Sequence, residues 1–439
     1  MKGQEIINKK KEKHSKMIIK TIEVKLQYNS LTLLQKEQLN ILFREAKWFK
    51  NYCIVQGDIF KVDTKIENIP VVKGDKTENE KLTLLSGHMK QDLKAELITS
   101  IKMLSTKKKQ GHKDKVGKLK FKSECNEIPL RQFGNTYNVD MEHKKVHITK
   151  VKGWIKVRGL DQLKNIEFDY ANAQLLRKAS GYYLHIITWQ YPPKAKPKKL
   201  NKNNMIGIDF GIGHNLTTTD GEVIDICVPE AKALKLAQKR FNKWYQKRKD
   251  EDLTKSEIKS KSKYWKLLNK VRKAYEKIVN KKIDKCNKVV SNLLKTNELI
   301  VIQDELIHNW HSGLFGRNVQ HSCMGLIKAE LKKSSKVYVI ESSFPSTQLC
   351  PKCGNKTPHS LDKREYTCNI CGYHHSNRDV KAAETILQEG INRLFGTKSD
   401  VKQSPVKQKS STQCKSKSTK SKKIAKSKRS TQEAFNALA

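Results

Sequence analysis

The stretch MIGIDFG, residues 205–211, decides the fold of the C-terminal half of the chain. Its nearly continuous apolar run is typical of a strand that is buried on both faces of a sheet. After a glycine-bearing turn, NLTTT (215–219) has the pattern of a second strand. The pair Asp220-Gly221 fits a tight hairpin turn into a third strand, EVIDICV (222–228). The sequence therefore predicts a sheet that begins at residue 205.

The remaining elements of this half follow from the same patterns. ELIVIQDE (298–305) and KVYVIES (336–342) are apolar runs of strand length, and a helix is expected between them at 324–331. Residues 229–295 are basic and have helical spacing, and a short helix is expected at 379–394. This half is therefore expected to be a sheet with helices and a long helical insertion.

The N-terminal half has a different arrangement of strands and helices. TIEVKLQ (21–27) alternates apolar and charged residues, which is the period of a half-buried strand. Helical spacing follows over 31–52 and again over about 81–106, and strand patterns return between 132 and 191. We therefore expect a β-rich body that is interrupted by a helical insertion.

The composition indicates a polyanionic partner. Lys and Arg number 89 against 44 Asp and Glu, which gives a formal net charge of +45 over 439 residues. Nucleic acid is the expected partner, because basic proteins release counterions from phosphates when they bind. An acidic membrane surface is the alternative, but no apolar run approaches the roughly 20 residues of a spanning helix. Since the N-terminal residues also lack an apolar signal core, we expect a cytoplasmic protein with no membrane association.

Four of the ten cysteines have the spacing of a metal site. Cys350-Pro-Lys-Cys353 and Cys368-Asn-Ile-Cys371 are separated by fourteen residues. Two such turns can direct four thiolates at one tetrahedral Zn²⁺ ion, and four protein ligands leave no open position for a substrate. The alternative is four unrelated reduced thiols. The paired spacing favours one structural zinc ion.

Acidic residues follow the predicted buried strands. Asp209 ends MIGID, Asp304 and Glu305 end LIVIQDE, and Asp379 opens the last predicted helix. Three acids at one sheet edge can bind two Mg²⁺ ions about 3.5–4 Å apart and activate water against a phosphodiester. Each acid alone also has an ordinary explanation, Asp209 as a turn residue, Asp379 as a helix N-cap and Glu305 as a rim charge.

The aromatic residues of the basic stretch 229–295 allow two interpretations. Trp244, Tyr264 and Trp265 lie among many Lys and Arg residues. Aromatic residues on such a helix are usually packed in a core, and its charges usually face solvent. With this net charge, contact with a nucleic acid is an equally good interpretation.

Several segments together resemble the TnpB family, which comprises insertion-sequence-encoded proteins similar to compact type V CRISPR effectors. The resemblance is sharp over 205–395, looser over 20–190 and absent in the tail. The segments that carry it are IGIDFGIGHNLTTTDG (206–221), IVIQDE (300–305), FPSTQLCPKCGNK (344–356), YTCNICGYHHSNRDVKAAETI (366–386) and the basic helical insertion.

The resemblance implies a multidomain α+β architecture. The N-terminal part would be a wedge-type β-barrel with a helical recognition insertion, and the C-terminal part a RuvC-like nuclease domain of RNase H fold with an inserted zinc ribbon. The predicted boundaries are 1–17 for a basic lead, 18–30 and 131–195 for the barrel, 31–130 for the recognition insertion, 196–204 for a linker, 205–228, 296–348 and 373–397 for the nuclease domain, 229–295 for the basic helical insertion, 349–372 for the zinc ribbon and 398–439 for a disordered basic tail.

The resemblance also assigns the acids by position. Asp209 matches the first catalytic acid of the family and Asp379 the third, and both are expected to bind magnesium. We expect Glu305 to be the second acid and magnesium ligand, with Asp304 in reserve. A gapless alignment would place Gln303 at the usual glutamate, but an amide offers no anionic oxygen.

Two other positions depart from the family pattern. Lys381 stands where the pattern D-x-N-A-A has asparagine, and Asn377 replaces an upstream aspartate. Neither is a catalytic position, so the departures are not expected to inactivate the protein.

The function implied by the resemblance is that of a transposon-encoded, RNA-guided DNA endonuclease. It would cut double-stranded DNA that matches a guide RNA and lies next to a short motif, by two-metal hydrolysis. Its cofactors would be two Mg²⁺ ions and one Zn²⁺ ion. Its partners would be a transposon-derived guide RNA of the omega RNA type and the target DNA, with one protein chain per RNA. The alternatives are a nuclease-inactive, RNA-guided DNA-binding protein and a compact type V CRISPR effector.

Overall fold

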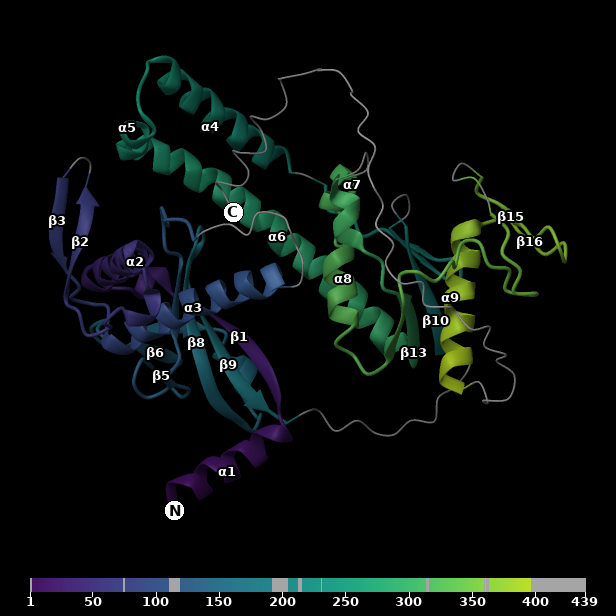
Figure 1. The fold of residues 1–439 in the computed structure, drawn as a ribbon, viewed down its shortest axis with the longest axis horizontal. Coiled ribbons are helices and arrows are strands. Elements are labelled where there is room, and N and C mark those ends of the chain that lie inside the picture. The colour runs from purple at the N-terminus through teal and green to yellow at the C-terminus, as the bar shows by residue number, and fades with distance from the viewer. Residues whose placement is uncertain are drawn as a thin grey trace. The chain divides into compact units, whose positions relative to one another are not determined.

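The computed structural model describes residues 2–73, 76–109, 119–191, 204–211, 215–229, 231–312, 316–358, 360 and 363–395 (Figure 1). Residues 196–203 of the predicted linker and the whole predicted tail at 398–439 lie outside this part of the chain. The described elements fall in one compact unit, Met1–Gly390, apart from the end of the last helix. In this part of the chain, no helix is long and apolar enough to cross a membrane.

The N-terminal strands form one antiparallel sheet of seven strands that is nearly closed into a barrel. Its strand order is β4-β8-β9-β1-β7-β6-β5. The strands are β1 (Ile18–Leu26), β4 (Glu127–Leu130), β5 (Tyr137–Asp140), β6 (Lys145–Ile148), β7 (Ile155–Arg158), β8 (Phe168–Lys178) and β9 (Gly181–Gln190). The expected β-rich body is therefore present. It already includes β4, which the boundary at residue 131 leaves out, because β4 pairs with β8 along its whole length.

The helices of this half pack on the sheet and share its core. Buried Leu39, Phe43 and Phe49 of α2 belong to the same apolar cluster as Val24 of β1 and Leu184 of β9. The other elements are the helices α1 (Lys2–Ser15), α2 (Leu33–Val55) and α3 (Gly87–Lys109) and the hairpin β2 (Asn68–Lys73) and β3 (Lys76–Lys81). Two details differ from expectation: the basic lead is largely helical, and the second helix begins after the hairpin.

The C-terminal strands form a five-stranded mixed sheet in the order β12-β11-β10-β13-β14. Strands β10, β13 and β14 are parallel to one another, and β11 is antiparallel to β10. The strands are β10 (Met205–Gly211), β11 (Asn215–Thr218), β12 (Val223–Ile224), β13 (Leu299–Gln303) and β14 (Val337–Ile340). The predicted strands are thus present, although the one expected over 222–228 is limited to the two residues of β12. Parallel pairing brings the carboxyl ends of β10 and β13 to one edge.

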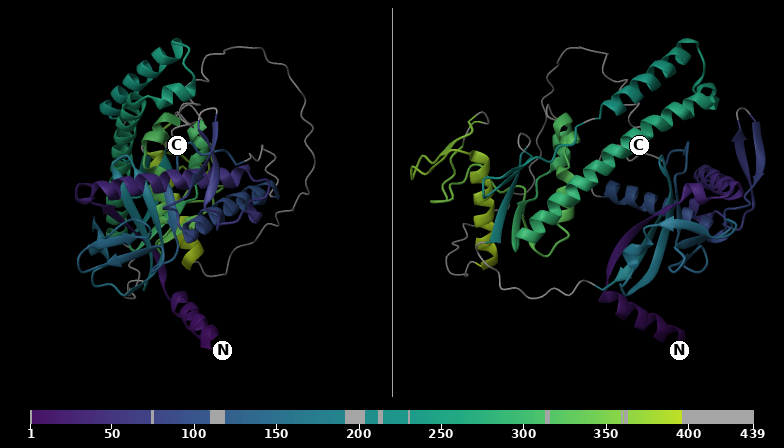
Figure 2. Two further views of the ribbon diagram at one scale, coloured as in Figure 1. Left: turned by 90° about the vertical axis from the view of Figure 1, so that its left-hand side faces the viewer. Right: turned by 180° about the vertical axis from the view of Figure 1, so that it is seen from behind.

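Helices cover both faces of this sheet, as Figures 1 and 2 show. Ile300 and Ile302 of β13 pack with residues of α6 and α8, whereas Leu299 and Val301 face the cluster that contains Ile386 of α9. All five residues of β13 are buried, which explains its continuous apolar run. The helices are α4 (Lys232–Asp250), α5 (Lys255–Ser260), α6 (Ser262–Thr296), α7 (Gly316–His321), α8 (Met324–Leu331) and α9 (Arg378–Phe395).

The aromatic residues of the helical insertion differ in their packing and exposure. Trp244 and Tyr264 belong to a small apolar cluster of α4, α5 and α6, with Ile258 and Leu268. Trp265 is 41% exposed, and its indole N–H donates to the Lys259 carbonyl. The packing interpretation therefore holds for Trp244 and Tyr264.

Two glycines let α9 lie directly on the sheet. A Cβ on Gly207 of β10 would come within 2.1 Å of the Ala383 carbonyl oxygen, and a Cβ on Gly390 would come within 2.6 Å of Val301. The α9 backbone that faces Gly207 and the buried strand β13 that faces Gly390 cannot move away to make space for a Cβ atom. Both positions therefore require glycine. The close approach fixes the N-terminal end of α9 beside the carboxyl end of β10.

We expect Gly207→Ala to lower the free energy of unfolding by roughly 1–3 kcal/mol, because an extra methyl group would push α9 off the sheet. Gly325→Ala in α8 is the control, since nothing lies within 4 Å of its added Cβ and alanine favours a helix. Urea unfolding of both variants measures the difference. Equal stability of Gly207→Ala and the unaltered protein would contradict the close packing.

Candidate functional site

The first acid, Asp209, lies near the carboxyl end of β10. The strand pairs with β11 on one side, where Asp209 is opposite Thr217, and with the parallel β13 on the other. Its neighbours Ile208 and Phe210 are buried in the core, which holds the backbone rigidly. The alternative of a turn residue is wrong, because Asp209 belongs to the strand itself.

The third acid, Asp379, lies in the first turn of α9, but it is not the cap of that helix. The side-chain oxygen of Asn377 accepts hydrogen bonds from the backbone N–H groups of Asp379 and Val380, at 2.9 and 3.3 Å. Asn377 therefore takes the capping role, and the N-cap interpretation of Asp379 is wrong. The Asp379 carboxylate lies instead 3.4 Å from an Arg364 nitrogen and 3.9 Å from Nε of Arg378.

The structure distinguishes between the two acids that follow β13. Asp304 is 2.6 Å from Nζ of Lys328 in α8 and of Lys332, the residue after that helix, and the hydrogen bonds of these ammonium groups hold its pKa below the usual range. Among the described residues Glu305 has no such pair of partners, and burial raises its pKa. Asp304 is therefore engaged by α8, while Glu305 remains available to a cation.

Gln303, the last residue of β13, is a structural residue. Its side-chain amide donates to the carbonyl oxygens of Ser342 and Phe344, at 3.1 and 2.7 Å, and its oxygen accepts from the Ser346 hydroxyl at 2.9 Å. All of its polar atoms are thus used in holding the segment that follows β14.

Electrostatic coupling shows that the three predicted acids lie in one region. The pKa of Asp209 is raised to about 7, first by removal of the carboxyl group from water and then by the negative charges of Asp379 and Glu305. Arg378 and Lys381 oppose this shift. Acids that repel one another in a partly buried site are typical of a place that receives cations.

The spacing of the acids differs from that of the cysteines. The thiols of the four cysteines all lie within 4.8 Å of one another. In the described part of the chain, no other set of three or more metal-ligand atoms is as close together. The three carboxylates are more widely spaced. The donor set of carboxylate oxygens is the one that Mg²⁺ prefers.

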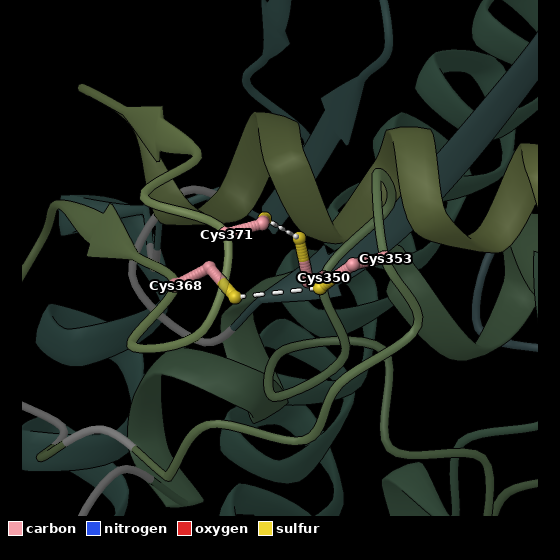
Figure 3. A group of neighbouring side chains, drawn as sticks. All are labelled: Cys350, Cys353, Cys368 and Cys371. Carbon is pink, nitrogen blue, oxygen red and sulfur yellow. Dashed lines mark hydrogen bonds between the residues drawn. The ribbon is translucent and has the colours of Figure 1, made fainter.

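The four cysteines converge as their spacing predicts (Figure 3). The Sγ atoms of Cys350 and Cys371 are 3.6 Å apart, and so are those of Cys353 and Cys368. A tetrahedron with Zn–S bonds of about 2.3 Å has edges of about 3.8 Å, so the four sulfurs fit one Zn²⁺ ion. The alternative of unrelated thiols is wrong.

The two knuckles repeat one backbone design. Gly354 donates its N–H to the Cys350 carbonyl at 2.9 Å, and Gly372 donates to the Cys368 carbonyl at 3.1 Å. Both glycines have left-handed backbone angles, with φ of +69° and +67°. A short two-stranded sheet of β15 (Tyr366–Thr367) and β16 (His374–His375) joins the second knuckle to α9.

Lys381 is the site residue whose role sequence reasoning missed. Its side chain is fully buried, and Nζ donates to the carbonyl oxygens of Ser346, Thr347 and Leu349. Burial lowers its pKa to about 8, although the nearby Cys350 acts in the opposite direction. The departure from the family pattern at this position was the signal that could have directed attention to it.

The fold and the cysteine group define a class of protein: a strongly basic chain with a nearly closed barrel, a group of four thiols and a mixed sheet whose edge carries several acids. Comparison with known proteins places this class more narrowly. A family model described as "Cas12f1-like, TNB domain" matches residues 326–386, and the OrfB_IS605 model, described as "Probable transposase", matches residues 187–309.

Two curated proteins are similar to the chain over much of its length. One, from Streptomyces pristinaespiralis, is named "Putative RNA-guided DNA endonuclease" and is 26% identical over 305 residues, which cover 63% of this chain and 75% of that protein. Another, from Escherichia coli (strain K12), is named "Putative RNA-guided DNA endonuclease InsQ" and is 21% identical over 278 residues, 57% of this chain and 63% of that protein. The predicted resemblance to the TnpB family is confirmed by these matches.

Solved structures also match. A chain in a cryo-EM structure of a Cas12f1–sgRNA–target DNA complex aligns with 84% of this chain and 99% of its own length, with a TM-score of 0.42 and 10% identity. A chain of a CRISPR–Cas12f ternary complex aligns over 81% of this chain and 80% of its own, with a TM-score of 0.21 and 13% identity.

We expect the purified protein to hold one Zn²⁺ ion per chain and Cys353→Ser to hold none, because three thiolates and a hydroxyl bind zinc much more weakly than four thiolates. The melting temperature should fall with zinc loss. Metal analysis and thermal unfolding measure both effects. Cys227→Ser is the matched control, since Cys227 lies outside the group of four. Full zinc content in Cys353→Ser would contradict the assignment.

The raised pKa of Asp209 predicts how stability depends on pH. The folded protein binds a proton at Asp209 more tightly than the unfolded chain does, so stability should fall as pH rises from about 4 through 7. Without divalent cations, we expect Asp209→Asn to raise the free energy of unfolding at pH 8 by roughly 2–4 kcal/mol, and the gain to shrink toward pH 5.

Asp304→Asn is the control for this experiment, because the pKa of Asp304 is lowered and its charge is favourable in the folded state. It should not stabilise the protein at pH 8. Urea unfolding at several pH values, in the presence of EDTA, measures both variants. If the difference in free energy of unfolding between Asp209→Asn and the unaltered protein does not change with pH, the raised pKa of Asp209 is contradicted.

Proposed function

We propose that the chain is an RNA-guided endonuclease that hydrolyses phosphodiester bonds in double-stranded DNA with two Mg²⁺ ions. The observation that carries the proposal is the electrostatic coupling of Asp209 with Asp379 and Glu305 at the carboxyl end of parallel strands. The names of the curated relatives, both RNA-guided DNA endonucleases, support the choice of substrate. The sheet order, with β10 central and β13 and β14 parallel to it, supports a RuvC-like domain.

The residues have distinct roles in the proposed reaction. Asp209, Glu305 and Asp379 would hold the two metal ions, which supply water activation and stabilise the leaving oxygen when bound. Strand β10 and helix α9 hold Asp209 and Asp379 rigidly, while Glu305 follows β13 directly. The four cysteines would hold one zinc ion with a structural role, because no coordination position is left open.

The basic surface supports nucleic acid as partner. A cavity of about 480 Å³ lies between Lys9, Lys10 and Lys13 of α1 and a group of aromatic residues on the barrel. In that group the rings of Phe133 and Tyr170 stack 4.1 Å apart, and Phe133 is 42% exposed. An exposed ring beside lysines suits a stacked base and its phosphate, and Asp169, which pairs with Lys13 at 2.9 Å, also lines the cavity. We infer a guide RNA and a target DNA as partners, with base pairing reading the sequence.

Cleavage of a matched target tests the proposed function. The protein is expressed with the DNA that flanks its gene, the co-purified RNA is sequenced, and a DNA target matching that RNA is supplied with Mg²⁺. We expect cutting by the unaltered protein, and a loss of more than about 100-fold for Asp209→Ala and Glu305→Ala, because direct metal ligands matter more than the residues that orient them.

Asp304→Ala is the matched control and should keep most of its activity, since Asp304 pairs with α8. Guide-dependent binding of the DNA without any cutting would identify a nuclease-inactive binding protein. Cutting of branched DNA in the absence of RNA would identify a guide-free nuclease instead. Either result would overturn the proposal.

A further inference from the structure

Two of the three positions at which the chain departs from the family pattern, 303 and 381, act on one segment. That segment, Ser342–Leu349, connects β14 to the first cysteine knuckle. Gln303 holds its beginning, through the carbonyl oxygens of Ser342 and Phe344. Lys381 holds its end, through the carbonyl oxygens of Ser346, Thr347 and Leu349 at 3.0, 2.9 and 2.7 Å.

Ser346 joins the two side chains directly. Its hydroxyl donates to the Gln303 side-chain oxygen at 2.9 Å, and its carbonyl accepts from Lys381. Gln303, Ser346 and Lys381 are all buried, so water does not compete for these bonds. The three groups therefore form one hydrogen-bonded unit between β13 and α9.

The surroundings of Lys381 explain how an ammonium group is tolerated at full burial. Its three N–H donors match the three carbonyl acceptors, and Nζ also lies 3.8 Å from the centre of the Tyr366 ring. None of the ion pairs among the described residues includes Lys381. Instead, its third acceptor, the Leu349 carbonyl, directly precedes Cys350, the first ligand of the zinc-binding group.

Each end of this unit lies next to a candidate magnesium ligand. Gln303 is two residues before Glu305, and Lys381 is two residues after Asp379. A shift of the Ser342–Leu349 segment would therefore reach the second acid, the third acid and the first cysteine knuckle together.

We propose that Lys381 and Gln303 are positioning residues that couple the cysteine-bound metal site to the carboxylate site through the Ser342–Leu349 segment. The inference rests on the proposed function for the identity of the acid site. Neither residue touches substrate or metal, and both act through the backbone that carries the ligands. Loss of either side chain should loosen both metal sites, although neither site loses a ligand.

Metal binding without nucleic acid tests this proposal independently of cleavage. Gln303→Met keeps the length of the side chain, and Lys381→Met keeps all but its terminal atom. Both changes remove the hydrogen-bonding groups. Mn²⁺ affinity is measured by electron paramagnetic resonance on the full-length, zinc-loaded protein, with Asp209→Asn to identify the signal of the acid site. Zinc release is measured as its rate in excess chelator.

We expect each variant to lose about 10- to 100-fold in Mn²⁺ affinity, the range found for residues that orient metal ligands. Zinc release should be faster in both. Lys333→Met is the control, because Lys333 is an exposed lysine just after α8. Among the described residues its ion pair is with Glu330, near the end of that helix. It should match the unaltered protein in both measurements.

The double variant separates coupling from general destabilisation. If both side chains act through one segment, Lys381→Met combined with Gln303→Met should lose little more affinity than the weaker-binding single variant. Effects that multiply would overturn the proposal, and so would Mn²⁺ affinity and zinc release equal to those of the unaltered protein. If Lys381→Met does not fold, Gln303→Met alone must still weaken Mn²⁺ binding, and unchanged affinity there would also overturn the proposal.

The outcome also separates this inference from the proposed function. If the unaltered protein binds Mn²⁺ at the Asp209 site but cuts no DNA, the proposed function is wrong. The measurements of Mn²⁺ affinity and zinc release then still decide whether the two sites are coupled. An unaltered protein that binds no Mn²⁺ at that site would remove the acid site, and the coupling with it.

Discussion

The contact on which the C-terminal half depends is the close packing of α9 against β10 and β13 at two glycines. Gly207 and Gly390 make it possible, since any Cβ at these positions would collide with the Ala383 carbonyl or with Val301. A helix held this closely cannot slide or tilt without losing contact with the core. Its first turn, with Asp379, is therefore fixed relative to the carboxyl end of β10, with Asp209. A catalytic group assembled from distant segments needs such rigid support, because its like charges repel one another.

At the same edge of the sheet, neighbouring acidic residues have different partners and different pKa shifts. Asp304 and Glu305 are adjacent in the chain, yet Lys328 of α8 and the following Lys332 hold the pKa of Asp304 low, while burial raises the pKa of Glu305. At the start of α9, Asn377 caps the helix and leaves the Asp379 carboxylate for other partners. Pairing and capping thus occupy the residues that could compete for a cation, and the acids that remain are those that share one electrostatic environment.

Much of this arrangement could be predicted from local patterns. The buried strands β10 and β13, the helix α8 and the cysteine knuckles follow from apolar runs and from paired CxxC turns, which are short-range signals. The sequence could not indicate that Asn377 is the cap, because Asn and Asp compete on equal terms for that position. It also could not separate Asp304 from Glu305, since the distinction depends on lysines more than twenty residues away, Lys328 and Lys332. The role of Lys381 was hidden for another reason: lysine is almost never fully buried, and only its three carbonyl partners make burial tolerable.

The hydrogen bonds of Ser346 have a consequence for descent. Glutamate at 303 would place a negative charge against the Ser342 and Phe344 carbonyl oxygens, and asparagine at 381 would be too short to reach three acceptors. A change at either position alone leaves buried carbonyl oxygens of one and the same segment without a donor, which disfavours independent drift of the two positions.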